Sequence, residues 1–160
     1  MQDIFWEYKT IVVFLHVLSS TVWVGGMIAM RYAAQPSFLE IESPAKRLER
    51  ISHALKRLFT IVLPFVIILF ITAFIMIKGY DLSHTEYSIF SHAKEGIWSI
   101  MFINLIVMMK RRNRADKMLQ EGNFAQAKNQ LEPIGKFMVP LNIFLGISAI
   151  FIGAYFSAIF

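Results

Sequence analysis

Cysteine is absent from the 160 residues of this sequence. Its absence excludes disulfide bonds, thiolate metal ligands and haem attached covalently through a C-x-x-C-H motif. Any metal or cofactor would therefore be held by histidine, methionine, oxygen ligands or packing. Near the start of the sequence, Asp3 and Glu7 stand where a secretory signal would have Lys or Arg, and no A-x-A cleavage site follows. We therefore expect the first hydrophobic segment to be retained.

Charged residues are the second scarce feature. Only 17% of the residues are charged while 56% are hydrophobic, and the mean hydropathy is +0.54. This composition predicts one integral membrane domain over residues 1–160. The long charge-free runs predict an all-α membrane protein, a four-transmembrane-helix up-and-down bundle, with spans at about residues 10–30, 58–77, 88–109 and 137–159.

The third of these spans is the shortest in charge-free residues. Only the 14 residues 96–109 carry no charge, whereas about 20 are needed to cross the hydrocarbon. The span must therefore begin near residue 88 and include His92, Lys94 and Glu95. We expect these side chains at or just below the outer interface, with the stem of Lys94 extended toward water.

Basic residues are concentrated in two segments. Of the 16 Lys and Arg, six lie in residues 31–57 and seven in residues 110–136, and four crossings place both segments on one side. This is the positive-inside pattern. It predicts a bacterial inner-membrane protein with these segments in the cytoplasm and both termini in the periplasm. Because orientation explains the net charge of +5, we expect the lipid bilayer and not nucleic acid as a partner.

Local signals predict where the cytoplasmic helices begin and end. Ser43 before Pro44 is typical of an N-cap followed by proline at the first helical position, so a helix should start there and run into the second span. Pro36 should break the chain after the first span. Gly122 and Asn123 should form the turn of a polar helical hairpin.

One ionisable side chain, His16, lies inside the first span. Lipid offers an imidazole no hydrogen-bond partner, so His16 must face protein, a cofactor or trapped water. Depth can be counted from the basic residue that ends each span on the cytoplasmic side. His16 lies 15 residues from Arg31, and Thr72 lies 15 residues from Arg57. His92 lies 18 residues from Lys110. The two histidines therefore differ in height by only about 4 to 5 Å.

The first and third helices of an up-and-down bundle are diagonal partners across its core. Imidazoles from His16 and His92 could then hold a planar macrocycle by its two axial positions or clamp a metal ion. The alternative is a histidine bonded to Ser19, Ser20 or a backbone carbonyl. Trp23, near mid-membrane, would serve for packing or as a wall for a flat cofactor.

A second polar level lies closer to the cytoplasm. Asn104 and Asn142 are each six residues from the basic residue at the inner end of their spans, at a depth of about 9 Å. We expect the two amides to form hydrogen bonds between closely packed helices; a polar lining for a translocation path is the alternative. Gly146 and Gly153 should give the fourth span a flat surface for helix packing.

Several short motifs resemble one family over nearly the whole chain. They are LHVLSSTVWVGGMIAMR around His16, RLFTIVLP at the start of the second span, His92 at the start of the third, EGNFAQA in the inner loop and VPLNIFLG in the fourth span. These motifs resemble the small CopD-type membrane proteins. The first helix also resembles that of the related four-span HemJ-type protoporphyrinogen oxidases, with matching positions at His16, Trp23, Arg31 and the H-A-K of His92 to Lys94.

The resemblance implies two functions. A HemJ-type protein would bind haem b or a porphyrin through His16 and pass electrons from protoporphyrinogen to a respiratory-chain or quinone acceptor, with Arg31 and Lys94 near the propionates. A CopD-type protein would handle copper, for which His16, His92 and His84 with methionines further in are the candidate ligands. A structural or assembly subunit is a third hypothesis. The sequence leaves open whether the chain is itself an enzyme and whether it forms homo-oligomers.

Overall fold

The computed structural model describes residues 2–80 and 88–159, with side chains for residues 5–80 and 93–155. Every element in these ranges is helical, which confirms the all-α prediction. In chain order the elements are α1 (Gln2–Ala29), the π-helical turn η1 (Met30–Ala34), α2 (Gln35–Leu39), α3 (Pro44–Gly79), α4 (Ser88–Gln120), α5 (Phe124–Pro133), the π-helical turn η3 (Ile134–Met138) and α6 (Val139–Ile159).

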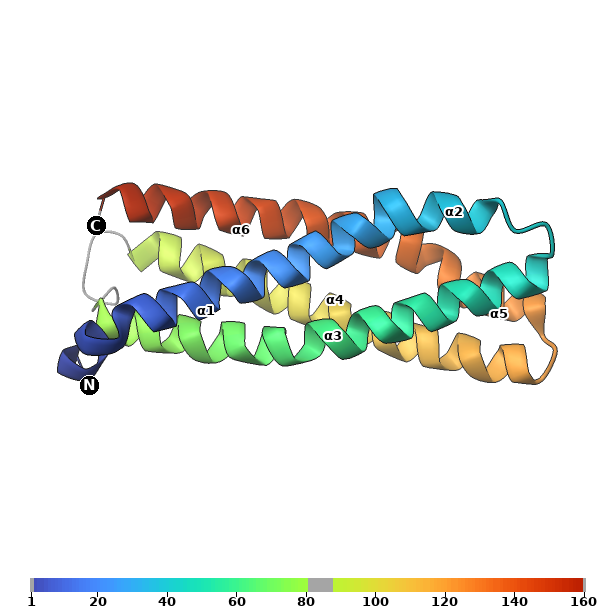
Figure 1. Ribbon diagram of the computed structural model, residues 1–160, viewed down its shortest axis with the longest axis horizontal. Helices are drawn as coiled ribbons and strands as arrows, with labels where there is room; N and C mark the ends of the chain where they lie inside the picture. Colours follow the sequence, from blue (N-terminus) through green and yellow to red (C-terminus); the bar gives the residue numbers. More distant parts are fainter. Residues whose placement is uncertain (1, 81–87, 160) are drawn as a thin grey trace.

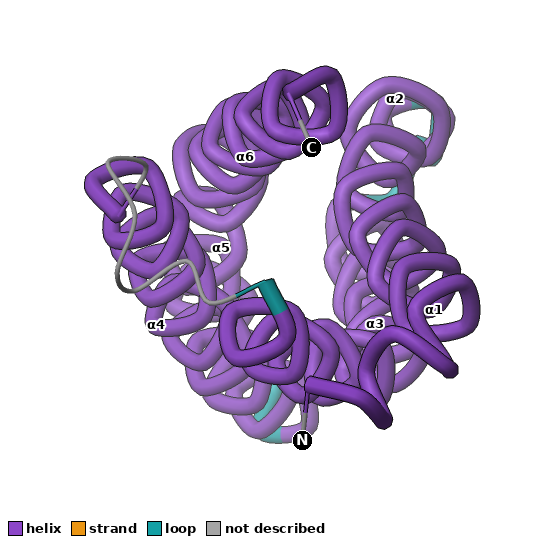
Figure 2. Tube along the Cα trace, turned by 90° about the vertical axis from the view of Figure 1, so that its left-hand side faces the viewer, coloured by secondary structure: helices purple, strands orange, loops and turns teal. Residues whose placement is uncertain are grey.

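The long helices α1, α3, α4 and α6 lie side by side along one axis (Figure 1). Both termini are at one end of the bundle, and the turns from α2 to α3 and from α4 to α5 are at the other. We call the latter the basic end, because residues 31–57 and 110–136 carry most of the Lys and Arg. Seen along the axis, the helices form a ring in which α1 contacts α3 and α6, and α4 contacts the same two from the opposite side (Figure 2). α1 and α4 are therefore diagonal, as predicted.

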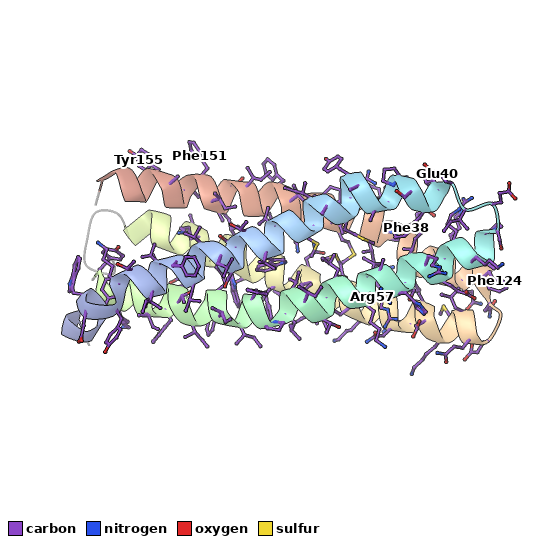
Figure 3. The ribbon with its side chains drawn as sticks, in the orientation of Figure 1. Phe38, Glu40, Arg57, Phe124, Phe151 and Tyr155 are labelled. Atoms are coloured by element: carbon purple, nitrogen blue, oxygen red, sulfur yellow. The ribbon has the colours of Figure 1, made fainter. Side chains whose placement is uncertain are left out.

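Within the described part of the chain, three helical segments are long and apolar enough to cross a membrane. They are Phe5–Leu39, Pro44–Gly79 and Phe124–Tyr155. Large apolar side chains point away from the bundle along them, among them Phe151 and Tyr155 on α6 (Figure 3). The structure thus supports a helical membrane protein. α4 does not meet the same criterion, because charged residues flank its short apolar stretch.

One continuous core runs through the bundle and past the apolar segments into the basic end. In the apolar half it contains Trp23, Met27, Val62, Val66, Leu105 and Met108, each at most 1% exposed. Beyond that half, α3, α4 and α5 continue the same core with Leu55, Ala115, Ala127 and Leu131. The polar hairpin predicted at this end is therefore packed against α3 as part of the bundle.

Two of the three local predictions at the basic end are confirmed. The Ser43 side chain accepts a hydrogen bond from the Lys46 amide, and Pro44 follows as the first residue of α3. Gly122 has φ +76°, a conformation that favours glycine, and forms the turn before α5. The prediction for Pro36 was wrong. The helix passes through Pro36. The π-helical turn η1 directly precedes α2 and shifts the backbone hydrogen-bond pattern just before the proline, which has no N–H to donate.

The predicted amide contact between the third and fourth spans is confirmed. Asn104 Nδ2 donates to Asn142 Oδ1 and to the Met138 carbonyl, both at 2.8 Å. Asn142 Nδ2 in turn donates to the Met101 carbonyl at 3.3 Å. Asn142 is fully buried. The two amides thus join α4 to the start of α6, which favours the packing role over a translocation path.

Gly146 allows α6 to approach α1 closely, and this gives a stability prediction. A Cβ at Gly146 would overlap the Val24 side chain, whereas a Cβ at Gly25 would meet nothing within 4 Å. We expect Gly146→Ala to lower the free energy of unfolding by about 1 to 3 kcal/mol. Gly25→Ala is the matched control and should be neutral or stabilising by up to about 1 kcal/mol. Unfolding by SDS in mixed micelles measures both, and equal effects would contradict the close approach.

Candidate functional site

His16 forms a hydrogen bond across the interface between α1 and α3. Its Nδ1 lies 3.0 Å from Thr72 Oγ1. The Thr72 hydroxyl has one proton and lies 2.8 Å and 3.0 Å from the carbonyls of Ile68 and Leu69 on its own helix. Because that proton is directed to these carbonyls, we assign His16 Nδ1 as the protonated donor and Thr72 Oγ1 as its acceptor. His16 Nε2 then carries a lone pair.

The register of the two helices brings these side chains together. On α3 the buried residues Val62, Val66, Leu69 and Thr72 recur every three or four positions, so Thr72 belongs to the stripe that faces the core. On α1 the side chains of Ser19 and Trp23, 1% exposed each, follow His16 at the same helical spacing. The equal depth of His16 and Thr72 in the sequence is therefore reproduced as a direct contact.

Three buried polar atoms, at the His16 level or within about two helical turns of it, have no hydrogen-bond partner among the described residues. They are Ser19 Oγ, Trp23 Nε1 and Trp98 Nε1. Trp98 belongs to α4 and packs against Phe70 of α3, close in sequence to Thr72, with ring centroids 5.0 Å apart. Leaving a buried donor unpaired costs about 1 to 3 kcal/mol. Such atoms in a membrane interior point to a ligand or an internal water as the missing partner.

Lys94 of α4 brings a positive charge to the same level. Its Nζ lies 3.5 Å from the position that a Cβ of Gly153 would occupy, so it lies against α6 where that helix has no side chain. Lys94 is half-buried, and it lies 16 residues from Lys110, which places it at about the depth of His16. This differs from the expectation that its stem extends toward water. No ion-pair partner for Lys94 is found among the described residues, and a buried cation requires an anion.

The structure places the other predicted site residues in different positions. Trp23 lies on the same face of α1 as His16, about two helical turns closer to the basic end. Arg31 lies in η1, where its Nη1 donates to Gln35 Oε1 at 2.6 Å. At 15 residues from His16, it is about 22 Å away along the helix. The structure therefore does not bring Arg31 to the His16 level.

Two predicted ligands lie wholly or partly outside the described residues. His84 falls in the segment 81–87, outside the described residues. His92 belongs to α4, but its side chain is outside the described set. A direct relation between His16 and His92 therefore stays a prediction.

Taken together, the described residues of the site combine a neutral imidazole, an ammonium group and unpaired donors inside an apolar bundle. His16 Nε2 can bind a metal ion or accept a proton, and Lys94 can neutralise a carboxylate. Among the described residues, no group of three or more His, Asp or Glu side chains forms a ready metal site. The arrangement is thus suited to a ligand that brings its own anionic groups.

Sequence reasoning placed Thr72 at the depth of His16 without assigning it to the site, and it did not single out Trp98. Thr72 had a usable signal, because it is a hydroxyl at the same depth as His16 in an otherwise apolar stretch. Trp98 had none, since an aromatic residue in a span is usually packing. No family model, no curated protein and no solved structure matches the chain. The resemblance to CopD-type and HemJ-type proteins therefore stays a prediction from short motifs.

Proposed function

We propose that the protein crosses a bacterial inner membrane four times, with α4 as the third crossing and both termini in the periplasm. α4 runs along the bundle beside the three apolar segments and exposes Ile100 and Ile103 on its outer surface. The contact of Lys94 with α6 supports this, because the bundle shelters a charge that lipid would disfavour. The basic end then lies in the cytoplasm, in agreement with the positive-inside rule.

Within this bundle we propose that His16 binds haem b or a related porphyrin through Nε2. The observation that carries the proposal is the 3.0 Å hydrogen bond between His16 Nδ1 and Thr72 Oγ1, in which we assign the imidazole N–H as the donor. Histidines that bind metals almost always donate their other ring N–H to an acceptor of the protein, which fixes the tautomer and the ring orientation. A structural histidine in a membrane interior also needs a partner, so the bond supports the proposal through the ring nitrogen that it leaves free and not through its existence alone.

The side chains around His16 fit a porphyrin with carboxylate groups. Lys94 offers an ammonium group without a described counter-ion, and Trp23 and Trp98 offer N–H donors without described acceptors. Trp98 also stacks on Phe102 with an interplanar angle of 10°, which forms a flat aromatic surface on α4. For the second axial position, the sequence offers His92.

A bound haem would supply one-electron redox chemistry, and the chain would set the conditions for it. Thr72 holds the imidazole in one tautomer, Lys94 balances negative charge, and the apolar core keeps water away from the site. We propose a role in electron transfer or in protoporphyrinogen oxidation, with a respiratory-chain component or a quinone as electron acceptor. This choice of reaction rests on the resemblance to HemJ-type proteins.

Copper binding without haem is the second candidate, and the buried methionines favour it. Met27 and Met108 are 0% exposed and Met101 is 4% exposed in the same core. Thioethers and imidazole are suitable ligands for Cu(I). Methionine also fills cores without binding metal, so metal analysis must decide between the two.

An absorbance spectrum of the full-length protein tests the proposal. The protein is purified in mild detergent from cells supplied with a haem precursor and measured before and after reduction with dithionite. We expect about one haem per chain, with a strong Soret band and a sharpened band near about 560 nm on reduction. A flat spectrum with about one copper per chain would overturn the haem proposal in favour of copper. A flat spectrum without metal would favour the structural subunit.

A further inference from the structure

A second site lies far from His16, on the outer surface between α3 and α4 near the basic end. An open groove of about 410 Å³ is bounded by residues 56–67 of α3 and 109–113 of α4. Arg57, which lies on α3 at the level of the groove but does not line it, is labelled in Figure 3. The groove faces outward, so lipid and not the bundle interior would fill it in a membrane.

The groove has a polar end and an apolar end. Lys56, Arg112 and Asn113 line the part nearest the basic end. Phe59, Leu63, Ile67 and Met109 line the rest, and the two helices run in opposite directions, so these residues all lie further into the apolar half. The lining therefore changes from cationic to apolar along one direction, as an amphiphile does.

The dimensions match one leaflet of a bilayer. Lys56 and Ile67 are 11 residues apart on α3, which corresponds to about 16 Å along the helix axis. Half of the hydrocarbon thickness is about 15 Å. A headgroup at Lys56 would therefore place an acyl chain along Phe59, Leu63 and Ile67 for its full length.

The charges at the polar end favour an anionic headgroup. Arg112 is already paired with Asp116 at 3.1 Å and donates to the Ser52 carbonyl, so its charge is largely balanced. The ammonium of Lys56 is exposed and has no hydrogen bond or ion pair with any described residue. Lys56 is therefore the cation that a phosphate would meet.

Pro64 adds a polar feature to the wall of the groove. Proline has no N–H, so the carbonyl of Thr60, four residues earlier, lacks its helical donor. Both residues line the groove. Thr60 lies one helical turn deeper than Lys56, where water at the polar boundary of a bound lipid can donate to this carbonyl, whereas a purely apolar ligand cannot.

We propose that this groove binds an anionic phospholipid of the cytoplasmic leaflet, with its phosphate at Lys56 and one acyl chain along the apolar part. The site is independent of the proposed haem and relies only on the membrane orientation. An apolar quinone would leave Lys56 and the Thr60 carbonyl without partners.

Lipid retention by the full-length protein tests the proposal. The protein in detergent is mixed with equal amounts of phosphatidylglycerol and phosphatidylcholine, and retained lipids are counted by native mass spectrometry. We expect preferential retention of one phosphatidylglycerol and about a fivefold loss of that preference in Lys56→Gln, since one basic side chain near a membrane surface contributes about that factor. Arg57→Gln is the matched control, because it removes the same charge at the same depth outside the groove and should keep the preference.

Two outcomes would overturn the proposal. Equal losses in Lys56→Gln and Arg57→Gln would indicate a diffuse attraction to basic residues without a defined site. Equal retention of both lipids by the unaltered protein would show that no anionic headgroup is recognised. Leu63→Trp provides a further variant. Its large ring should displace the acyl chain and lower the retention of phosphatidylglycerol, although Lys56 and Arg57 both remain.

Discussion

Replacing His16 with alanine is expected to remove nearly all haem from the purified protein, and Thr72→Val to weaken haem binding by about 10- to 100-fold. The first change removes the proposed ligand. The second leaves His16 in place but removes the acceptor 3.0 Å from its Nδ1. Without this bond the ring can rotate and change tautomer, so Nε2 is no longer held as the free nitrogen. Haem titration of the purified variants, followed at the Soret band, measures both effects.

Two further variants show whether the Thr72 hydroxyl is the cause. Thr72→Ser keeps the hydroxyl and should restore most of the affinity. Thr21→Val makes the same change as Thr72→Val, but the Thr21 hydroxyl donates only to the Val17 carbonyl on its own helix, at 2.9 Å. It should leave haem binding unchanged. Equal losses in Thr21→Val and Thr72→Val would contradict the assigned role, as would full haem content in His16→Ala.

The depth of each polar residue could be predicted from the sequence, because the rise per residue of a helix is fixed. Asn104 and Asn142 were expected at one level and are bonded to each other. His16 and Thr72 were expected at one depth and are also in contact. The basic residue at the cytoplasmic end of each span gave a common starting point from which these depths were counted. The lengths of the spans and the positions of the charges were therefore sufficient to predict the depth of these polar residues along the bundle axis.

The rotation of each helix could not be predicted in the same way, because it depends on packing between side chains distant in sequence. Ser19, Ser20 and a backbone carbonyl were the alternative partners of His16 to a cofactor. In the structure, Ser20 donates to the Val17 carbonyl and Ser19 is buried without a described partner. Lys94 was expected to extend toward water and instead lies against α6 at Gly153. Each difference follows from which face of a helix meets its neighbour.

The π-helical turn η1 could not be predicted from sequence patterns either. Pro36 indicated a break, since proline removes a helical donor and usually ends or kinks a helix. The structure instead inserts a wider turn over Met30–Ala34, and the helix continues as α2. Hydrophobic periodicity does not register one extra residue in a turn. The first span and its extension into the basic end therefore form one helical arm, which carries Arg31 away from His16.

Arg112→Ala is expected to lower the free energy of unfolding by about 1 to 3 kcal/mol, the usual cost of leaving buried hydrogen-bond partners unpaired. The Arg112 side chain is 5% exposed in the basic end of the bundle. Its guanidinium donates to the Ser52 carbonyl and to Asn113 Oδ1 and pairs with Asp116, each at 3.1 Å. The Ser52 hydroxyl also donates to Asp116 at 3.2 Å, so two hydrogen bonds of Ser52, one to each member of the Arg112–Asp116 pair, connect α3 to α4.

Arg114→Ala is the matched control, because Arg114 is exposed two positions away and its loss should change stability by no more than about 0.5 kcal/mol. SDS unfolding of both variants in mixed micelles, with helicity followed by circular dichroism, makes the comparison. A large effect of Arg112→Ala alone would mean that the basic end is held by a buried polar network as well as by Leu55 and Ala115. Equal small effects would mean that the apolar core carries this end by itself. The ion pair with Asp116 would then matter for the charge of the neighbouring groove and not for the fold.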